Sequence, residues 1–186
     1  SGLNGTSQRR VHTVMKNMFK TAVQWRLLES NPVDGVNAPR AEDRQLVIPS
    51  AQQIHATLDA LQGNRHHLAF KVLLHSGARR GEIAALRWSD VNFSTNQIHI
   101  EGSIVSVKGL GLTYAPPKTK SSLRTIGLDA EVMEMLRDHR FSQMKYIKEH
   151  QGAVLDDGWV FTTAVGSILD PLVLTESWRK AADSVG

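Results

Sequence analysis

The chain has 186 residues, enough to bury a core, and this length suits one domain or one domain with part of another. It contains no cysteine, which excludes a disulfide framework and a thiolate metal site. Its 22 basic and 18 acidic residues give a net charge of +4, which permits a polyanionic partner without requiring one. No apolar run approaches the ~20 residues that span a bilayer, so we expect no membrane association and a cytoplasmic protein.

The first part of the chain predicts one amphipathic helix. Residues 7–28 carry apolar side chains at the i, i+3, i+4 spacing of a buried helical face. Ser7 is the expected N-cap, and Pro32 follows the helix and stops it. So wide an apolar face needs partners, so we interpret residues 1–38 as the last helix of a domain. The polar residues 39–49 lack periodicity and predict a linker.

Three helices are predicted after the linker. Ser50 and Gln53 form the capping-box pair that begins the first of them. The second covers about residues 65–76, and Gly77 can end it as a C-cap. The third runs over about residues 80–86. These helices begin a new domain, which we place at residues 50–186.

The apolar period then shortens to that of strands. Residues 97–104 and 123–128 alternate as half-buried strands do, and glycines and prolines between them favour a strand meander. The rest of the pattern predicts a helix over 128–150, a short strand over 159–161, and a last helix capped by Asp170 and Pro171. The order of elements predicts an α+β fold, mainly helical, with a small antiparallel sheet.

Arg79 is the first candidate for chemistry. A guanidinium can hold two non-bridging oxygens of a phosphodiester through paired N–H donors, and it stays charged at any working pH. Such an arginine needs a carboxylate that fixes its rotamer, and Glu82 lies one helical turn away. Taken alone, these two residues fit an ordinary surface ion pair better than a catalytic pair.

Lys118 is the second candidate. When a phosphodiester is cleaved, the departing 5′ oxygen must be protonated, and a lysine can deliver that proton. Lys120 competes for the same role and otherwise contacts a phosphate. A Lys-Thr-Lys sequence by itself fits a solvated basic turn. The histidines are scattered without metal-ligand spacing, so we expect no metal site.

The two candidate segments together resemble a known family. Residues 76–90 read Ser-Gly-x-Arg-x-x-Glu and then Leu-Arg-Trp-x-Asp, and residues 117–128 place Lys-Thr-Lys ahead of Arg-Thr-Ile. Both resemble the catalytic domain of the phage-integrase, or tyrosine recombinase, family. The resemblance implies that Arg79 is the first catalytic arginine, that Glu82 supports it, and that Lys118 rather than Lys120 is the catalytic lysine. Gly127 departs from the family pattern, which usually has proline there.

The resemblance also implies a domain plan and DNA contacts. Residues 1–38 would be the C-terminal helix of a core-binding (SAM-like) domain, residues 39–49 the interdomain linker, and residues 50–186 part of the catalytic domain. The candidate DNA contacts are Lys120, Arg124, Arg80 and Arg40.

The family's activity is site-specific recombination of double-stranded DNA through a 3′-phosphotyrosine, without metal or cofactor. Resemblance therefore implies duplex DNA with an attachment-type site as the partner, self-association on DNA, and a nucleoid-associated location. No histidine has an arginine three residues on, and neither Tyr114 nor Tyr146 lies where the family has its nucleophile. We therefore expect an inactive fragment of a recombinase. The alternatives are a catalytically dead DNA-binding module or regulator, and an α+β domain unrelated to DNA.

Overall fold

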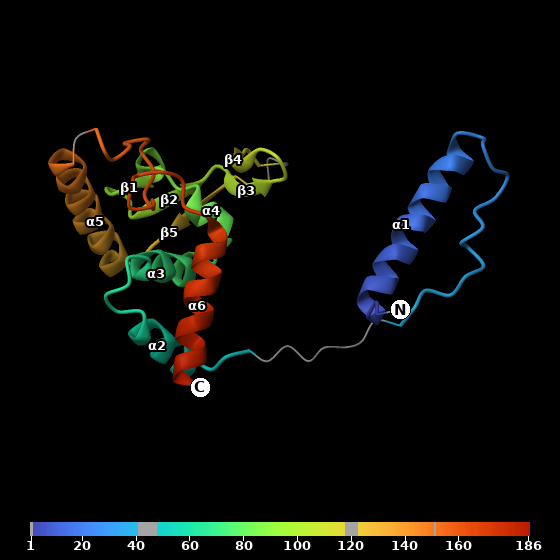
Figure 1. Cartoon of the computed structure of the whole chain (residues 1–186), viewed down its shortest axis with the longest axis horizontal. Coiled ribbons are helices and arrows are strands. Elements are labelled where there is room, and N and C mark those ends of the chain that lie inside the picture. Colours follow the sequence, from blue (N-terminus) through green and yellow to red (C-terminus); the bar gives the residue numbers. More distant parts are fainter. Residues whose placement is uncertain (1, 41–47, 118–122, 151) are drawn as a thin grey trace. The chain divides into compact units, whose positions relative to one another are not determined.

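The computed structural model describes residues 2–40, 48–117, 123–150 and 152–186. They belong to two compact units, residues 1–48 and residues 49–186 (Figure 1). Within the described ranges, no helix combines the length and the apolar character that crossing a membrane requires.

The first unit consists of one long helix and a segment that returns along it. Helix α1 spans Gly5–Gln24, and its N-cap is Asn4, whose Oδ1 accepts the Ser7 N–H at 2.8 Å. The prediction that Ser7 caps this helix was wrong, because the asparagine three residues earlier already accepts that amide. Asn31 donates to the Lys16 carbonyl at 3.0 Å, and Lys16 pairs with Asp34 at 3.1 Å, so both bonds tie the returning segment to the helix.

The predicted apolar face of α1 lies at the surface of this unit. The helix has no buried residue, and the exposed fraction reaches 67% at Val14 and 55% at Met18. Val33, in the returning segment, is buried. Among the described residues of this unit, one short segment runs back along the helix, as Figure 1 shows.

The second unit holds the remaining helices. They are α2 (Ala51–Ala60), α3 (His67–Ser76), α4 (Arg80–Ala84), the short 3-10 helix η1 (Trp88–Asp90), α5 (Ala130–Glu149) and α6 (Pro171–Val185). Their predicted ends are largely confirmed. Ser50 and Gln53 form the capping box of α2, Gly77 ends α3 in the left-handed conformation at φ 60°, and Asp170 caps α6 ahead of Pro171.

Two small antiparallel sheets lie between the helices. The first has the order β1-β2-β5, from Val91–Asn92, Gln97–Ile100 and Arg124–Gly127. The second is the hairpin of β3 (Ser103–Val107) and β4 (Gly111–Ala115). The strand predicted over residues 159–161 is wrong, since only an isolated bridge forms between Trp159 and Arg87.

The single strand predicted over residues 97–104 is also wrong, because the chain leaves one sheet and enters the other at residues 101–102. Tyr114 explains the break. Its hydroxyl donates to the Glu101 carbonyl at 3.0 Å, and its ring covers Gly102, where a Cβ would come within 2.3 Å of the ring. The aromatic ring therefore occupies the space that a side chain at residue 102 would need.

One core joins these layers and positions the hairpin. Buried residues of α3, α4, β2, α5 and α6 pack together, among them Val72, Ile83, Ile98, Leu136 and Leu174. Strand β3 packs on α4, where Gly81 leaves room for it: a Cβ there would lie 2.8 Å from the Ile104 carbonyl oxygen. The hairpin thus approaches the short helix on which Arg79 and Glu82 lie.

Candidate active site

Arg79 and Glu82 meet at the N-terminus of α4. Gly77 ends α3, and the Ser76 hydroxyl accepts the Ala78 N–H at 3.2 Å, so the chain turns before a new helix begins. Glu82 Oε2 accepts the backbone N–H of Arg79 at 2.7 Å. Glu82 Oε1 accepts from Arg79 Nη1 at 3.0 Å. One carboxylate therefore caps the helix and holds the arginine side chain.

A second arginine binds the same carboxylate. Arg124 lies on β5 opposite Ile100 of β2. Its Nη2 donates to Glu82 Oε2 at 2.7 Å, and its Nη1 donates to Glu82 Oε1 at 3.2 Å. The sequence suggested Arg124 as a DNA contact, and the structure brings its guanidinium onto Glu82. Sequence reasoning missed this bond, and the only available signal was that a basic residue interrupts a half-buried strand.

The electrostatics of this cluster follow from burial and hydrogen bonding. Only 6% of the Glu82 side chain is exposed, and burial by itself raises a carboxyl pKa. The hydrogen bonds from Arg124, the Arg79 backbone and the Arg79 side chain outweigh that effect and lower the Glu82 pKa to about 2. The bond to Glu82 raises the pKa of Arg124. Glu82 is therefore ionised near neutral pH, and one carboxylate with two guanidinium groups gives the cluster a net charge of +1.

Arg79 presents this charge to solvent. Its side chain is 79% exposed, against 33% for Arg124. Within the described residues, the guanidinium of Arg79 has Glu82 as its hydrogen-bond partner through Nη1. The remaining guanidinium donors have no hydrogen-bond partner among the described residues and are available to an anion.

A cavity of about 250 Å³ opens beside this cluster, between α4 and the β3–β4 hairpin. It is lined by Arg79, Glu82, Ile100, Gly102, Ser103, Val105, Ala115, Pro116 and Pro117. Lys118 and Lys120 lie outside the described residues. Described residues on either side of them in the sequence belong to the site: Pro117 lines the cavity, and Arg124 binds Glu82.

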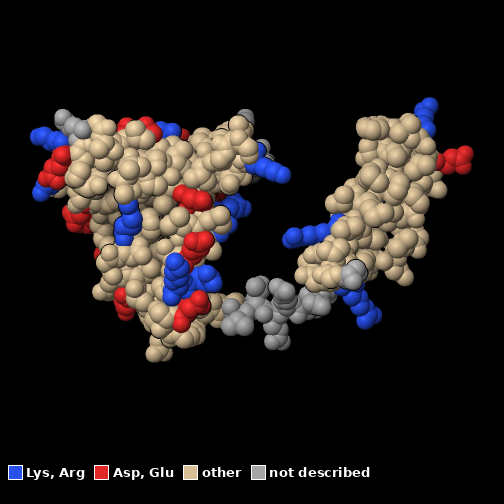
Figure 2. All heavy atoms as spheres, in the orientation of Figure 1, with Lys and Arg blue, Asp and Glu red and all other residues tan. Residues whose placement is uncertain are grey.

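Two other predicted DNA contacts, Arg80 and Arg40, are among the described residues. The Arg80 guanidinium donates to the Thr175 hydroxyl on α6. Arg40 is exposed in the first unit. On the face drawn in Figure 2, Lys and Arg side chains lie among Asp and Glu side chains rather than in one basic patch. Surface charge alone therefore singles out no binding face in this view.

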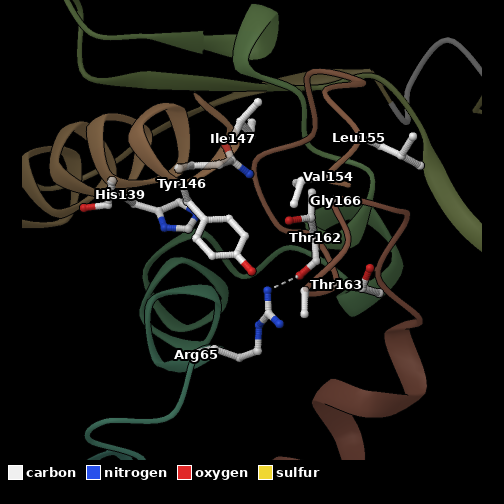
Figure 3. A pocket seen from close by; sticks show the side chains of 12 residues that line it. Arg65, His139, Tyr146, Ile147, Val154, Leu155, Thr162, Thr163 and Gly166 are labelled. Atoms are coloured by element: carbon white, nitrogen blue, oxygen red, sulfur yellow. Dashed lines mark hydrogen bonds between the residues drawn. The ribbon is translucent and has the colours of Figure 1, made fainter. Parts of the chain in front are cut away.

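A second cavity, of about 420 Å³, lies between α5 and the 154–166 loop. Figure 3 shows Arg65, His139 and Tyr146 around it, with Arg65 bonded to the Thr162 carbonyl at 3.0 Å. His139 bonds the Val160 carbonyl at 2.8 Å, and burial lowers its pKa, so it is a neutral packing residue. None of the described residues that line it carries a carboxylate. This cavity offers no acid–base pair and is the weaker candidate site.

Within the described ranges, no group of three or more His, Asp or Glu side chains is placed to hold a metal ion. The chemistry that the cluster of Arg79, Glu82 and Arg124 supports is binding and stabilisation of a negatively charged oxygen group. Its exposed arginine, buried carboxylate and adjoining cavity together form the candidate active site.

Comparison with known proteins identifies relatives of both units. Residues 49–186 match the model of the phage integrase family. A tyrosine recombinase XerC-like protein of Caldanaerobacter subterraneus is 26% identical, over 100% of this chain and 52% of the relative. An integrase of Streptomyces ambofaciens is 29% identical, over 96% of this chain and 47% of the relative. The chain thus spans about half the length of these curated relatives.

Solved structures share the fold. The Tn1549 transposon integrase, in complex with a circular intermediate DNA, superposes with a TM-score of 0.77 at 22% identity, covering 100% of this chain and 61% of that chain. A lambda integrase tetramer bound to a Holliday junction gives a TM-score of 0.61 at 15% identity, covering 98% and 46%. The prediction of an α+β fold of the tyrosine recombinase type is confirmed.

Proposed function

This chain belongs to the phage integrase family, and we propose that it supplies part of the DNA-cleaving site of a tyrosine recombinase. The observation that carries the proposal is the exposed Arg79 guanidinium, which a buried carboxylate holds at the edge of a cavity. Such a group binds the scissile phosphate and stabilises the charge that gathers on its non-bridging oxygens. Because Glu82 already fixes the arginine, little reorganisation is needed when that charge develops.

The reaction proposed is the one that the family resemblance implies. A tyrosine oxygen attacks the phosphorus and forms a 3′-phosphotyrosine, while the bond to the 5′ oxygen breaks and that oxygen takes a proton. Rejoining reverses these steps with the 5′ hydroxyl of another strand. The bond energy is kept in the phosphotyrosine, so the proposal includes no metal or nucleotide cofactor.

Lys118 is the proposed donor of the proton. Its support is the position of its neighbours in the chain, since Pro117 lines the cavity that Arg79 borders. Lys120 is the competing candidate. A duplex in which sulfur replaces the bridging 5′ oxygen distinguishes them, because a thiolate leaves without protonation. We expect the sulfur substrate to restore cleavage to the variant that lacks the acid and not to the other variant.

The proposed partner is double-stranded DNA with an attachment-type site, on which the whole protein self-associates. The Tn1549 and lambda integrase structures, which were solved with DNA, support this proposal by analogy. Direct DNA contacts by Lys120, Arg80, Arg40 and Arg124 stay predictions. So do the cytoplasmic, nucleoid-associated location and the division into a core-binding helix at residues 1–38, a linker at 39–49 and a partial catalytic domain at 50–186.

Arg79→Ala tests the catalytic role in the whole protein that contains this chain. We expect strand cleavage to slow by about 10²–10³-fold while duplex affinity changes little, because one phosphate contact among many is lost. Arg137→Ala is the matched control, since Arg137 also forms an i, i+3 ion pair, but its partner Glu134 is exposed whereas Glu82 is buried. Near-normal cleavage by Arg79→Ala would remove this arginine from the mechanism.

The 186-residue chain itself tests the rival function, a DNA-binding module without catalysis. The chain is incubated with nicked duplexes selected for binding from a random pool, and covalent protein–DNA adducts are sought on a denaturing gel. We expect salt-sensitive binding and no adduct from this chain. An adduct formed by the whole protein but not by a whole protein lacking its tyrosine nucleophile favours the recombinase. A whole protein that binds without forming any adduct favours the binding module.

A further inference from the structure

Arg124 makes a more extensive contact with Glu82 than the Arg79 side chain does. Two guanidinium nitrogens of Arg124 bond Glu82, at 2.7 and 3.2 Å, whereas Arg79 reaches the same carboxylate through Nη1 at 3.0 Å. The bidentate arrangement is the geometry in which a guanidinium neutralises a carboxylate most fully. The arginine that is less exposed therefore makes the larger part of the neutralising contact.

The charge balance of the site depends on this second arginine. Arg79 and Glu82 alone sum to zero, and a buried carboxylate beside Arg79 repels any phosphate that approaches it. With Arg124 the three side chains sum to +1 (two guanidinium groups less one carboxylate). The excess charge then resides at Arg79, whose side chain is the most exposed of the three.

We propose that Arg124 is a positioning residue that neutralises Glu82, so that Arg79 keeps its positive charge and its outer N–H donors for the scissile phosphate. Arg124 acts through Glu82 without contacting the phosphate, in place of the direct DNA contact that the sequence suggested. This inference rests on the proposed function of Arg79 and assigns to that site a residue from another part of the chain.

The fold explains why a residue on β5 can do this. Antiparallel pairing of β2 with β5 places Arg124 opposite Ile100, a residue that lines the same cavity as Arg79. Glu82 and Arg124 are 42 residues apart in sequence, yet their bond joins α4 to the first residue of β5. The residues that precede β5 include the segment 118–122, in which the candidate lysines occur.

The test compares phosphate binding in the 186-residue chain and three variants. Inorganic phosphate is titrated at low ionic strength, and the Nε–Hε NMR signal of Arg79 reports binding at that side chain, with the Arg137 signal as the reference. We expect Arg124→Gln to weaken phosphate binding at Arg79 by about tenfold, because the cluster loses one unit of positive charge. Arg124→Lys keeps the charge and loses the bidentate geometry, so we expect a loss of only about two- to threefold.

The decisive variant is Arg124→Gln combined with Glu82→Gln, which returns the cluster to a net charge of +1. We expect this double variant to bind phosphate within about threefold of the wild-type chain. A merely structural role predicts the opposite, since removing both partners of the ion pair then only adds to the loss of binding. Should Arg124→Gln alone fail to fold, the lysine variant and the double variant still make the comparison.

The outcomes distinguish a failure of the role proposed for Arg124 from a failure of the role proposed for Arg79. If the double variant binds no better than Arg124→Gln, or Arg124→Gln binds as the wild-type chain does, the charge-balancing role of Arg124 is overturned and the role of Arg79 stands. If phosphate leaves the Arg79 signal of the wild-type chain unmoved, the proposed phosphate site fails and this inference fails with it. Rescue in the double variant supports both.

Discussion

Replacing Glu82 with glutamine tests the energetic importance of the buried carboxylate. The substitution keeps the size of the side chain and removes its charge, so the two arginines lose an ionised acceptor. Because Glu82 is ionised and buried, its charge stabilises the folded state only while both arginines hydrogen-bond it. We expect Glu82→Gln to lower the free energy of unfolding at pH 7.

The size of the effect follows from the pKa. The folded-state value is about 2 and the ordinary value is 4.5, and the difference corresponds to about 3 kcal/mol of stability. The folded-state pKa lies below the unfolded one, so this contribution is fully present above the unfolded pKa and disappears as the pH falls. The cost of Glu82→Gln should therefore be constant at pH 5 and above, fall to less than half at about pH 3, and nearly vanish at about pH 2.

Urea unfolding of the wild-type chain and of Glu82→Gln, at a series of pH values, measures this cost. The matched control is Glu134→Gln, because Glu134 pairs with Arg137 at the same 2.7 Å that separates Glu82 from Arg124. The Glu134 side chain is 63% exposed, so its pair should contribute about 0–1 kcal/mol. Equal costs for the two substitutions, or a cost for Glu82→Gln that does not shrink on acidification, would refute this reasoning.

Three further predictions concern the packing and capping of the second unit, and the same unfolding measurement tests each of them. Gly81→Ala places a Cβ 2.8 Å from a backbone carbonyl oxygen of β3 and should lower the free energy of unfolding by about 1–3 kcal/mol. Gly127→Ala places its Cβ in open space and should lower it much less. Similar losses for the two variants would contradict the close packing of α4 on the hairpin. Ser50→Ala should cost about 1 kcal/mol and Ser50→Gly only a few tenths, and equal losses contradict the capping box. The Arg87 guanidinium carbon lies 3.9 Å from the centre of the Trp159 ring, so Arg87→Ala should lower the free energy of unfolding by about 1 kcal/mol. An unchanged free energy of unfolding would show that this stacking does not stabilise the fold.

Features that depend on neighbouring residues were predictable from the sequence. The capping box at Ser50, the left-handed end of α3 at Gly77 and the start of α6 at Asp170 are each specified by residues within one turn of the chain. The same holds for the contact between Arg79 and Glu82, which are one turn apart. The exception is the start of α1, where both Asn4 and Ser7 are good N-caps and only the earlier one is used.

Features that depend on distant residues were not predictable. The alternation of residues 97–104 indicates one strand, but Tyr114 takes the space above Gly102 and the strand breaks there. The alternation of apolar and polar residues predicts which face of a strand is buried, but it does not predict which distant side chain packs against the strand. The apolar face of α1 is a similar case, since its spacing indicates burial and the described residues of the first unit leave it exposed.

The candidate site combines a contact between residues close in sequence with a contact from a distant strand, and the distant contact determines the charge of the site. From Arg79 and Glu82 alone, the sequence specifies a neutral ion pair, which has no net attraction for a phosphate. The structure adds Arg124 through strand pairing, and the cluster becomes a cation with its most exposed guanidinium outward. The same local motif can therefore form an inert surface pair or a phosphate site, depending on a residue that the motif does not contain. Charge counted over the assembled cluster, rather than over the motif, is the quantity that decides between them.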